Sequence, residues 1–538
     1  MILNHEMLSE RAKQQHIKVE DIQVRRGIIL DREGRQLALN LDLESLYCEP
    51  EILHHDNKSI KKLASALEEK PEVILTKIPV EGKFAWVERK LEPSTAEKIR
   101  SQNIKGLGFM NEAKRVYPKG KLASHILGFV GLDNQALEGL ELQYDRYLST
   151  RGGKVFFERD ASGRILSSGV DKEVRGNNIV LTIDEGLQGI VEREIEKAIA
   201  KWKAVAASAI MMDPFTGEIL ALANWPSYDP NNPGKASNFE KRNRAITDCY
   251  EPGSTFKIVV GIGALEENIV RPDTLFDVSK GGIEVGTKTI HDVHKHGTLT
   301  FKEVIQKSSN VGSIMIGMRL GKERIYKYAK LLGIGEKTGI DLPGEVSGWI
   351  RPPERWSGTS LGAIPIGQEV AVTPLQILRA YSAIANGGFL IKPHIVSEVT
   401  SPEDQLIYSF TDNKMKQIIS AKTAGIFKEI LKSVVEGGTG ENASIEGDEV
   451  AGKTGTAQRI DPKTKRYSKE KYVSSFVGFV PADKPMFSLI VVIYEPKGQI
   501  YGGVVAAPVF RDIANQALSY LNIPRKNIPH ETTLLVAR

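Results

Sequence analysis

Three short motifs in this chain of 538 residues carry side chains that together can transfer an acyl group. They lie at 254–257, 308–310 and 453–455 and read Ser-Thr-Phe-Lys, Ser-Ser-Asn and Lys-Thr-Gly. Each motif is short enough to occur by chance. In this order and together they supply a serine nucleophile, a lysine base and a strand that can bind an anion.

The first motif combines a nucleophile with its base. Ser254 follows a turn signal at 251–253 and opens an apolar run over 254–265, which is typical of a buried helix. We therefore expect Ser254 at a helix N-terminus, where unpaired N–H groups and the helix dipole favour negative charge. Lys257 lies one turn further along the same face. A lysine in a dry site loses proton affinity and can deprotonate a serine. The alternative is an N-cap serine with a surface lysine, which the apolar flanks of Lys257 fit poorly.

The second motif is predicted to form a turn between two helices. Thr300 and Glu303 have the spacing of a capping box, so one helix begins there and closes at the motif. A second, apolar helix follows. The turn can direct Ser308 and Asn310 into a cleft. Ser308 can relay a proton between Lys257 and a leaving amine, and the Asn310 amide can both donate to and accept from a peptide. In isolation, an ordinary polar turn explains the same residues.

The third motif is predicted to lie on an edge strand. It precedes two strong strand candidates, over 472–479 and 486–493. A peptide can add to such an edge through main-chain hydrogen bonds. Gly455 would let the backbone of that peptide come close.

The side chains around Gly455 suit an anionic ligand. Lys453, Thr454 and Thr456 can hold a terminal carboxylate. The backbone N–H of Thr456, together with that of Ser254, can form an oxyanion hole. The alternative is that the lysine only protects a sheet edge from further pairing.

The composition is that of a globular protein with more than one domain. The net charge of +5 is small for this length and gives no reason to expect nucleic-acid binding. The two cysteines, Cys48 and Cys249, define neither a disulfide framework nor a zinc site.

The chain resembles the class B penicillin-binding proteins, the D,D-transpeptidases of bacterial cell-wall synthesis, and among them the division (septal) type most. The resemblance covers nearly the whole chain. The segments that carry it are 26–32, 139–141, 213–221, 226–232, 242–257, 306–312 and 372–376.

The resemblance implies an α+β multidomain fold. A penicillin-binding/serine β-lactamase-like transpeptidase domain, with an antiparallel sheet flanked by helices, would stand on an elongated mixed N-terminal pedestal. We predict the pedestal, of the penicillin-binding protein dimerisation type, over 1–185. The transpeptidase domain follows over 186–525, and a C-terminal tail over 526–538.

Local patterns predict further elements of the second domain. A stripe of apolar residues from Leu187 to Trp202 predicts a core helix after Asp184. The run 206–213 reads as a buried strand. Thr373 opens another helix, with proline in its first turn, and a last helix is expected over about 508–521.

The resemblance also implies a reaction. A donor peptide ending in D-Ala-D-Ala would lie along the Lys453 strand, Ser254 would attack it, and an amine from a neighbouring peptide would complete the cross-link. β-Lactams would acylate Ser254 as substrate mimics. The reaction needs no metal or organic cofactor. The predicted catalytic residues are Ser254, Lys257, Ser308, Asn310 and Lys453, and the predicted substrate-binding residues are Thr454, Gly455 and Thr456.

The implied partners are peptidoglycan stem peptides, β-lactams, a membrane glycosyltransferase of the shape/division family and other divisome proteins. The implied location is the inner membrane, with a periplasmic catalytic domain. No stretch of the chain reaches the apolar length of a transmembrane helix. We therefore expect the family's membrane span to be missing, through trimming or a misplaced start codon.

Other readings stay open. An elongation-type transpeptidase fits the same motifs. A D,D-carboxypeptidase or class D-like β-lactamase would pass the acyl group to water, and a division scaffold would keep the fold without catalysis. Two further features are weaker: a histidine cluster over 291–296 lacks a fourth metal ligand, and the Gly-rich run 436–440 lacks the lysine of a phosphate loop.

Overall fold

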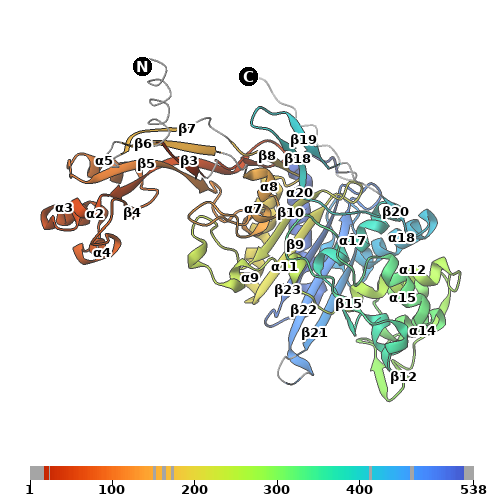
Figure 1. Ribbon diagram of the computed structural model, residues 1–538. Helices are drawn as coiled ribbons and strands as arrows, with labels where there is room; N and C mark the ends of the chain where they lie inside the picture. The colour runs from red at the N-terminus through yellow and green to blue at the C-terminus, as the bar shows by residue number, and fades with distance from the viewer. Residues whose placement is uncertain are drawn as a thin grey trace, which may run out of the picture.

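The computed structural model describes residues 17–22, 25–149, 153–159, 165–170, 175–410, 415–460, 464 and 466–525. Figure 1 shows an elongated molecule in which a narrow N-terminal arm leads to a larger C-terminal body. The body holds the three motifs.

The body is built on a five-stranded antiparallel sheet in the order β10-β9-β23-β22-β21. The two central strands are buried along their whole length, because apolar residues occupy both of their faces. β21, which carries the third motif, is the edge strand, as predicted. The strands are β9 (Ala206–Met212), β10 (Ile219–Trp225), β21 (Ala451–Ile460), β22 (Tyr467–Val480) and β23 (Phe487–Tyr494).

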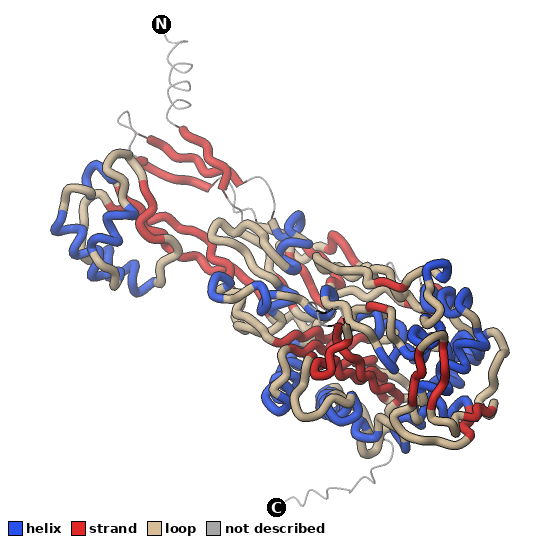
Figure 2. The backbone as a smooth tube through the Cα atoms, turned by 90° about the horizontal axis from the view of Figure 1, so that it is seen from below, coloured by secondary structure: helices blue, strands red, loops and turns tan. Residues whose placement is uncertain are grey.

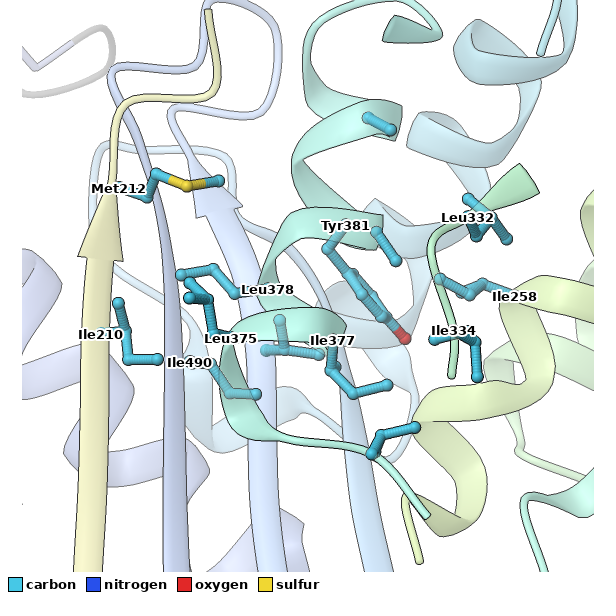
Figure 3. Packing of buried hydrophobic residues seen from close by; sticks show 14 of the residues in the cluster. Ile210, Met212, Ile258, Leu332, Ile334, Leu375, Ile377, Leu378, Tyr381 and Ile490 are labelled. Atoms are coloured by element: carbon cyan, nitrogen blue, oxygen red, sulfur yellow. The ribbon is translucent and has the colours of Figure 1, made fainter. Parts of the chain in front are cut away.

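Helices cover both faces of this sheet, as expected. On one face, α9 and α20 pack on the inward side chains of β9 and β23. On the other, α12 and α17 form the larger core, and Figure 3 shows Leu375 and Leu378 of α17 directed at Ile210 and Ile490 of the sheet. These helices are α9 (Glu185–Trp202), α12 (Lys257–Glu266), α17 (Pro374–Ala385), α18 (Ala421–Gly437) and α20 (Ala507–Tyr520).

The predicted helix signals are confirmed. The Asp184 carboxylate accepts the N–H groups of Gly186 and Leu187 at the start of α9. Thr373 and Gln376 form a capping box at the start of α17. The side chain of Thr300 caps α13 in the same way.

Further elements of the body include a hairpin and helices around the second motif and a short helix beside β21. They are β12 (Gly282–Val285), β13 (Lys288–His291), α13 (Phe301–Gln306), α14 (Asn310–Leu320), α15 (Lys322–Leu331) and α19 (Gly502–Val505).

The arm is a long seven-stranded sheet with helices at its far end (Figure 2). The strands are β2 (Ile29–Leu30), β3 (Gln36–Cys48), β4 (Ala85–Glu88), β5 (Leu107–Val116), β8 (Asn178–Leu181), β18 (Val396–Thr400) and β19 (Leu406–Ser409). The helices at the far end are α2 (Pro50–Leu53), α3 (Asn57–Leu67), α4 (Pro71–Lys77) and α5 (Pro93–Arg100). A separate sheet joins β1 (Ile17–Ile22), β6 (Gly153–Arg159) and β7 (Ile165–Val170), and α6 (Ser124–Leu127), α7 (Gly139–Gln143) and α8 (Asp145–Leu148) lie near the body.

A buried charge cluster fixes the base of the arm. The Glu141 carboxylate accepts from Arg26 Nε at 2.7 Å and from Arg115 Nε at 2.6 Å, and its side chain is fully buried. Arg26 also pairs with the half-exposed Asp145. The cluster joins three segments that are distant in sequence. Removal of one member would leave a buried charge unpaired, which is strongly destabilising.

The arm's sheet includes a hairpin from the body. β18 pairs with β8, and β19 extends the same sheet, so residues 396–409 belong to the sheet of the arm. The predicted boundary at residue 185 follows β8 in sequence, and the tail over 526–538 lies outside the described residues. No helix among the described residues is both long and apolar enough to cross a membrane.

Candidate active site

The three motifs meet at one place in the body. The first lies in the 3-10 turn η2 (Gly253–Phe256) and the start of α12, the second in the turn between α13 and α14, and the third on β21. Lys257 connects the first two through hydrogen bonds, and its charge also acts on Lys453 of the third.

Ser254 lies in the 3-10 turn η2, three residues before α12 begins at Lys257. The backbone enters η2 at Gly253 with φ of +55°, and the Lys257 N–H donates to the Ser254 carbonyl in the 3-10 pattern. The Thr255 hydroxyl donates to the Pro252 carbonyl at 2.8 Å, which tightens the turn. Ser254 is half-buried, and within the described chain its hydroxyl has no hydrogen-bond partner. The prediction of a helix N-terminus is therefore corrected to a 3-10 turn that precedes α12.

Lys257 is fully buried and makes three hydrogen bonds. Its Nζ donates to the Ser308 carbonyl at 2.6 Å, to the Ser308 hydroxyl at 3.2 Å and to Asn310 Oδ1 at 3.0 Å. Burial lowers the pKa of Lys257 to about 7, while the negative charge of Asp292 opposes the shift. The lysine can therefore gain and lose a proton near neutral pH.

The turn of the second motif is shaped to receive this lysine. Ser308 has φ of +59°, a conformation uncommon for a residue with a side chain. Ser309 then caps α14 by accepting from the Gly312 N–H. The Asn310 amide holds Lys257 through its oxygen and donates from Nδ2 to the His291 carbonyl at 3.1 Å. Asn310 thus orients the lysine and keeps only one N–H for a substrate.

Asp292 is a site residue that sequence reasoning missed. It follows β13, and its carboxylate accepts from the Ser309 hydroxyl at 2.8 Å and from the N–H groups of Asn310 and Val311. These contacts place a negative charge at the start of α14, where the helix dipole favours it. The nearby histidines gave the only local signal in the sequence.

The third motif presents alternate faces of β21. Lys453 is fully buried on the face toward α12, and burial together with the charge of Lys257 lowers the pKa of Lys453 well below its ordinary value. Lys453 Nζ donates to the Thr454 hydroxyl at 3.4 Å, and that hydroxyl lies 2.8 Å from the hydroxyl of Thr439. Thr456 accepts from the Gly502 N–H at 3.0 Å, which leaves its own hydroxyl proton to donate.

Thr439 is the second residue that sequence reasoning missed. It belongs to the Gly-rich run 436–440, which lacks the lysine of a phosphate loop. The structure folds this run against β21 and the start of α19, so Thr439 and Thr454 present neighbouring hydroxyl groups. The proximity of the run to the third motif in sequence was the only available signal.

Gly455 permits close packing of the turn that carries Ser254 against β21. A Cβ at this position would lie 2.3 Å from Ser475 Oγ, 3.0 Å from Thr255 Cγ2 and 3.1 Å from the Pro252 carbonyl oxygen. The glycine therefore lets the turn that carries the nucleophile approach the strand, and the predicted approach of a ligand backbone stays a prediction.

The same packing brings the backbones of the two oxyanion-hole candidates together. A Cβ on Gly253 would lie 2.8 Å from the Thr456 carbonyl oxygen. The turn that carries Ser254 and the strand that carries Thr456 are thus adjacent. No group of three metal-ligating side chains that could hold an ion occurs in the part of the chain that the structure describes.

Comparison with known proteins agrees with this architecture. The family description "Penicillin binding protein transpeptidase domain" matches residues 207–515, and "Penicillin-binding Protein dimerisation domain" matches residues 21–181. Stage V sporulation protein D of Bacillus subtilis is 38% identical over 536 residues, which cover 97% of this chain and 82% of that protein. Peptidoglycan D,D-transpeptidase FtsI of Escherichia coli is 33% identical over 534 residues, covering 97% and 88%.

The solved structures agree as well. Penicillin-binding protein 3 of Mycobacterium tuberculosis, complexed with aztreonam, is similar with a TM-score of 0.74 and 29% identity, over 94% of this chain and 98% of that one. The chain belongs to the class B penicillin-binding proteins.

Proposed function

We propose that this chain is a serine D,D-transpeptidase that cross-links peptidoglycan stem peptides through an acyl-enzyme on Ser254. The observation that carries the proposal is the contact of the buried Lys257 with Ser308 and Asn310, beside the turn that holds Ser254. A buried lysine with a pKa of about 7 is suited to accept a proton from a serine.

In the acylation step, the free base of Lys257 takes the proton of the Ser254 hydroxyl. The serine oxygen bonds to the carbonyl carbon of the penultimate D-alanine, and the oxyanion receives hydrogen bonds from the N–H groups of Ser254 and Thr456. The C–N bond then breaks. The departing nitrogen takes a proton from Lys257 through Ser308, whose hydroxyl lies 3.2 Å from the lysine. A free D-alanine leaves, and the serine ester remains.

The terminal carboxylate of the donor peptide binds at the third motif. Lys453 supplies positive charge when protonated, and Thr454 and Thr456 supply hydroxyl groups. Thr439 adds a hydroxyl beside Thr454. A carboxylate approaching Lys453 raises the proton affinity of a lysine that burial has weakened, so substrate binding and protonation of this lysine reinforce each other.

In the second step, the amine of a neighbouring stem peptide attacks the ester carbonyl. Lys257 accepts the amine proton and returns a proton to Ser254, so the enzyme is restored and a new amide bond forms. In the carboxypeptidase alternative water takes the place of the amine. A β-lactam acylates the same serine, but its C–N bond opens within a ring, so no leaving group departs.

Intact-mass spectrometry after incubation with benzylpenicillin tests the nucleophile. Wild type is expected to gain the mass of one penicillin, and Ser254→Ala none. Ser382→Ala is the matched control, because Ser382 is a buried serine that bonds within α17; it should react like wild type. A wild-type protein that stays unmodified, or an adduct that persists on Ser254→Ala, would refute the site.

The fate of the acyl-enzyme separates the transpeptidase from the hydrolases. We expect a penicillin adduct that lasts many minutes, and a thioester donor whose acyl group passes to an added D-amino acid. Rapid turnover of penicillin, or transfer to water alone in the presence of the amine, would instead assign a β-lactamase or a carboxypeptidase.

We further propose a septal role at the outer face of the inner membrane, where stem peptides are cross-linked. The resemblance of 242–257 to the division type and the similarity to FtsI support this role. A fluorescent fusion should gather at the division site. Distribution along the side wall would favour an elongation role, and recruitment only during sporulation would favour a role like that of the B. subtilis relative.

The arm is proposed to be the pedestal, over 1–185, and the body the transpeptidase domain, over 186–525. The partners proposed for the pedestal are a membrane glycosyltransferase and other divisome proteins. Co-purification with the arm tests these partners, and complementation of growth by wild type and by Ser254→Ala tests the scaffold alternative. A scaffold would support growth without the serine, whereas the transpeptidase would not.

A further inference from the structure

The turn that carries Ser254 depends on contacts from outside itself. η2 is only one turn of 3-10 helix, a geometry with weaker internal hydrogen bonds than an α-helix. Tyr250, just before it, exchanges two backbone hydrogen bonds of 3.0 Å with Val372. The Gly253 N–H donates to the Gly367 carbonyl at 3.2 Å. One segment, over 367–372, therefore holds the entry to the turn.

Gly367 allows that contact to be a direct approach of two backbones. It has φ of +77°, and a Cβ there would lie 2.1 Å from the carbonyl oxygen of Gly253. A side chain would push the segment and the turn apart. The separation of the two backbones is thus set by the absence of a side chain.

Tyr381 holds the exit of the same turn. It lies on α17, is fully buried, and its hydroxyl donates to the Thr255 carbonyl at 3.0 Å. Figure 3 shows the phenol extending from α17 toward the helix that carries Ile258. Burial raises the pKa of Tyr381 well above its ordinary value, so the hydroxyl remains a hydrogen-bond donor.

The contacts at the entry and at the exit of the turn come from one continuous part of the chain. The segment over 367–372 runs directly into α17, whose first turn is fixed by the capping box of Thr373 and Gln376. α17 packs on the central sheet through the large core. The turn that carries Ser254 is therefore set relative to the sheet by its neighbours, and not only by the start of α12.

We propose that Tyr381 is a positioning residue for the nucleophile, acting through the carbonyl of Thr255, the residue after Ser254. The proposal rests on the proposed function of Ser254. It separates two tasks of the site: Ser308 and Asn310 orient the base, while Tyr381 and Gly367 orient the nucleophile.

This separation predicts a specific kinetic signature. Loss of the Tyr381 hydroxyl would let the turn shift without disturbing Lys257, which is held from the other side. Small displacements of a reacting atom slow the chemical step strongly. Acylation should therefore slow, while non-covalent binding of the β-lactam and the pH dependence of acylation stay unchanged.

The test is Tyr381→Phe, with stopped-flow kinetics of acylation by a chromogenic cephalosporin. The rate constant of acylation is expected to fall about tenfold or more. The dissociation constant of the initial complex should stay within about twofold of the wild-type value. The pH midpoint of acylation should stay within about a few tenths of a pH unit of the wild-type midpoint. An unchanged rate constant, or a change confined to initial binding, would overturn the proposal.

Tyr328→Phe is the matched control. Tyr328 is also a buried tyrosine packed on α12, but its hydroxyl donates to Glu267 at 2.8 Å, and its ring lies against Gly263. This variant should lose a similar amount of thermal stability and acylate at the wild-type rate. An equal rate loss in both variants would mean a general structural effect and would overturn the proposal.

Gly367→Ala provides a second, independent variant with the same expected signature. The comparison also distinguishes two failures. If wild type and Tyr328→Phe are not acylated, the proposed function fails. If they are acylated and Tyr381→Phe behaves like them, only the positioning role fails.

Discussion

The Nζ of Lys257 lies 2.6 Å from the carbonyl oxygen of Ser308, a residue whose backbone has φ of +59°. The two serines of the site are placed differently relative to this lysine. Ser254 precedes Lys257 by one turn of chain, whereas Ser308 contacts it through both its carbonyl and its hydroxyl. The backbone contact orients the lysine, and the hydroxyl offers a route for a proton.

Replacement of Ser308 should separate these two contributions. Ser308→Ala and Ser308→Gly both remove the hydroxyl and keep the carbonyl. We expect acylation by benzylpenicillin to slow by about 10²-fold in both, the lower range for loss of a proton-transfer group. Because glycine adopts a positive φ freely, Ser308→Gly should be the more stable variant by thermal melting, by about 1 kcal/mol. A rate near that of wild type in either variant would show that Ser308 carries no proton.

The pH dependence of acylation should report Lys257. Its pKa is lowered to about 7, so the free base forms as the pH rises through that value. The acylation rate constant should therefore rise from pH 5 to about 8 and then level off. Stopped-flow measurements at constant ionic strength give the midpoint. A rate that is flat through pH 7 would assign the base to another group.

The free energy of unfolding should also depend on pH through Lys257. Between about pH 7 and the ordinary lysine value of 10.5, the unfolded chain binds a proton at Lys257 that the folded chain has lost. The contribution of Lys257 to stability therefore increases with pH across this window. Lys257→Met should abolish acylation yet melt no lower than wild type at pH 7, and its relative advantage should shrink toward pH 10. Lower stability of the variant at pH 7 would contradict this.

Asp292 links the helix cap to the base. Its negative charge opposes the lowering of the Lys257 pKa, so Asp292→Asn should move the midpoint of acylation to lower pH. The same change weakens the contacts with the start of α14, and a loss of about 1 kcal/mol is expected from denaturant titration. Asp273→Asn, a change of an exposed carboxylate, is the control. A midpoint that stays in place would mean that the charge does not reach the lysine.

The buried charges of the arm should matter for folding and not for chemistry. Glu141→Gln leaves Arg26 and Arg115 without their shared carboxylate and is expected to lower the free energy of unfolding by about 3 kcal/mol or more. Well below the melting temperature, the rate of acylation should remain that of wild type. A slow acylation rate in a folded Glu141→Gln protein would reveal coupling between arm and cleft.

The sequence was most informative where a pattern is local. The capping residues Thr300 and Thr373 predicted the starts of two helices, and the strand candidates over 472–479 and 486–493 match β22 and β23. The three motifs predicted which residues would meet. Their assigned roles rest on chemistry that the proposed experiments test.

Contacts between distant segments could not be predicted. Asp292 and Thr439 come to the site only because the chain folds back on itself, and the histidines near Asp292 and the third motif near Thr439 were the only signals in the sequence. The start of α12 was misplaced by one turn, because Gly253 and the contacts of Gly367 favour a 3-10 turn over the helix that the apolar run suggested.

The shared sheet of the arm has a mechanical consequence. Because β18 is hydrogen-bonded to β8, the connection between arm and body is a continuous layer of strands and not a single linker. A force applied at the helices α2 to α5 would be transmitted to the body through these hydrogen-bonded strands. The arm and the body are thus expected to turn together, with the angle between them set by the pairing of β18 with β8.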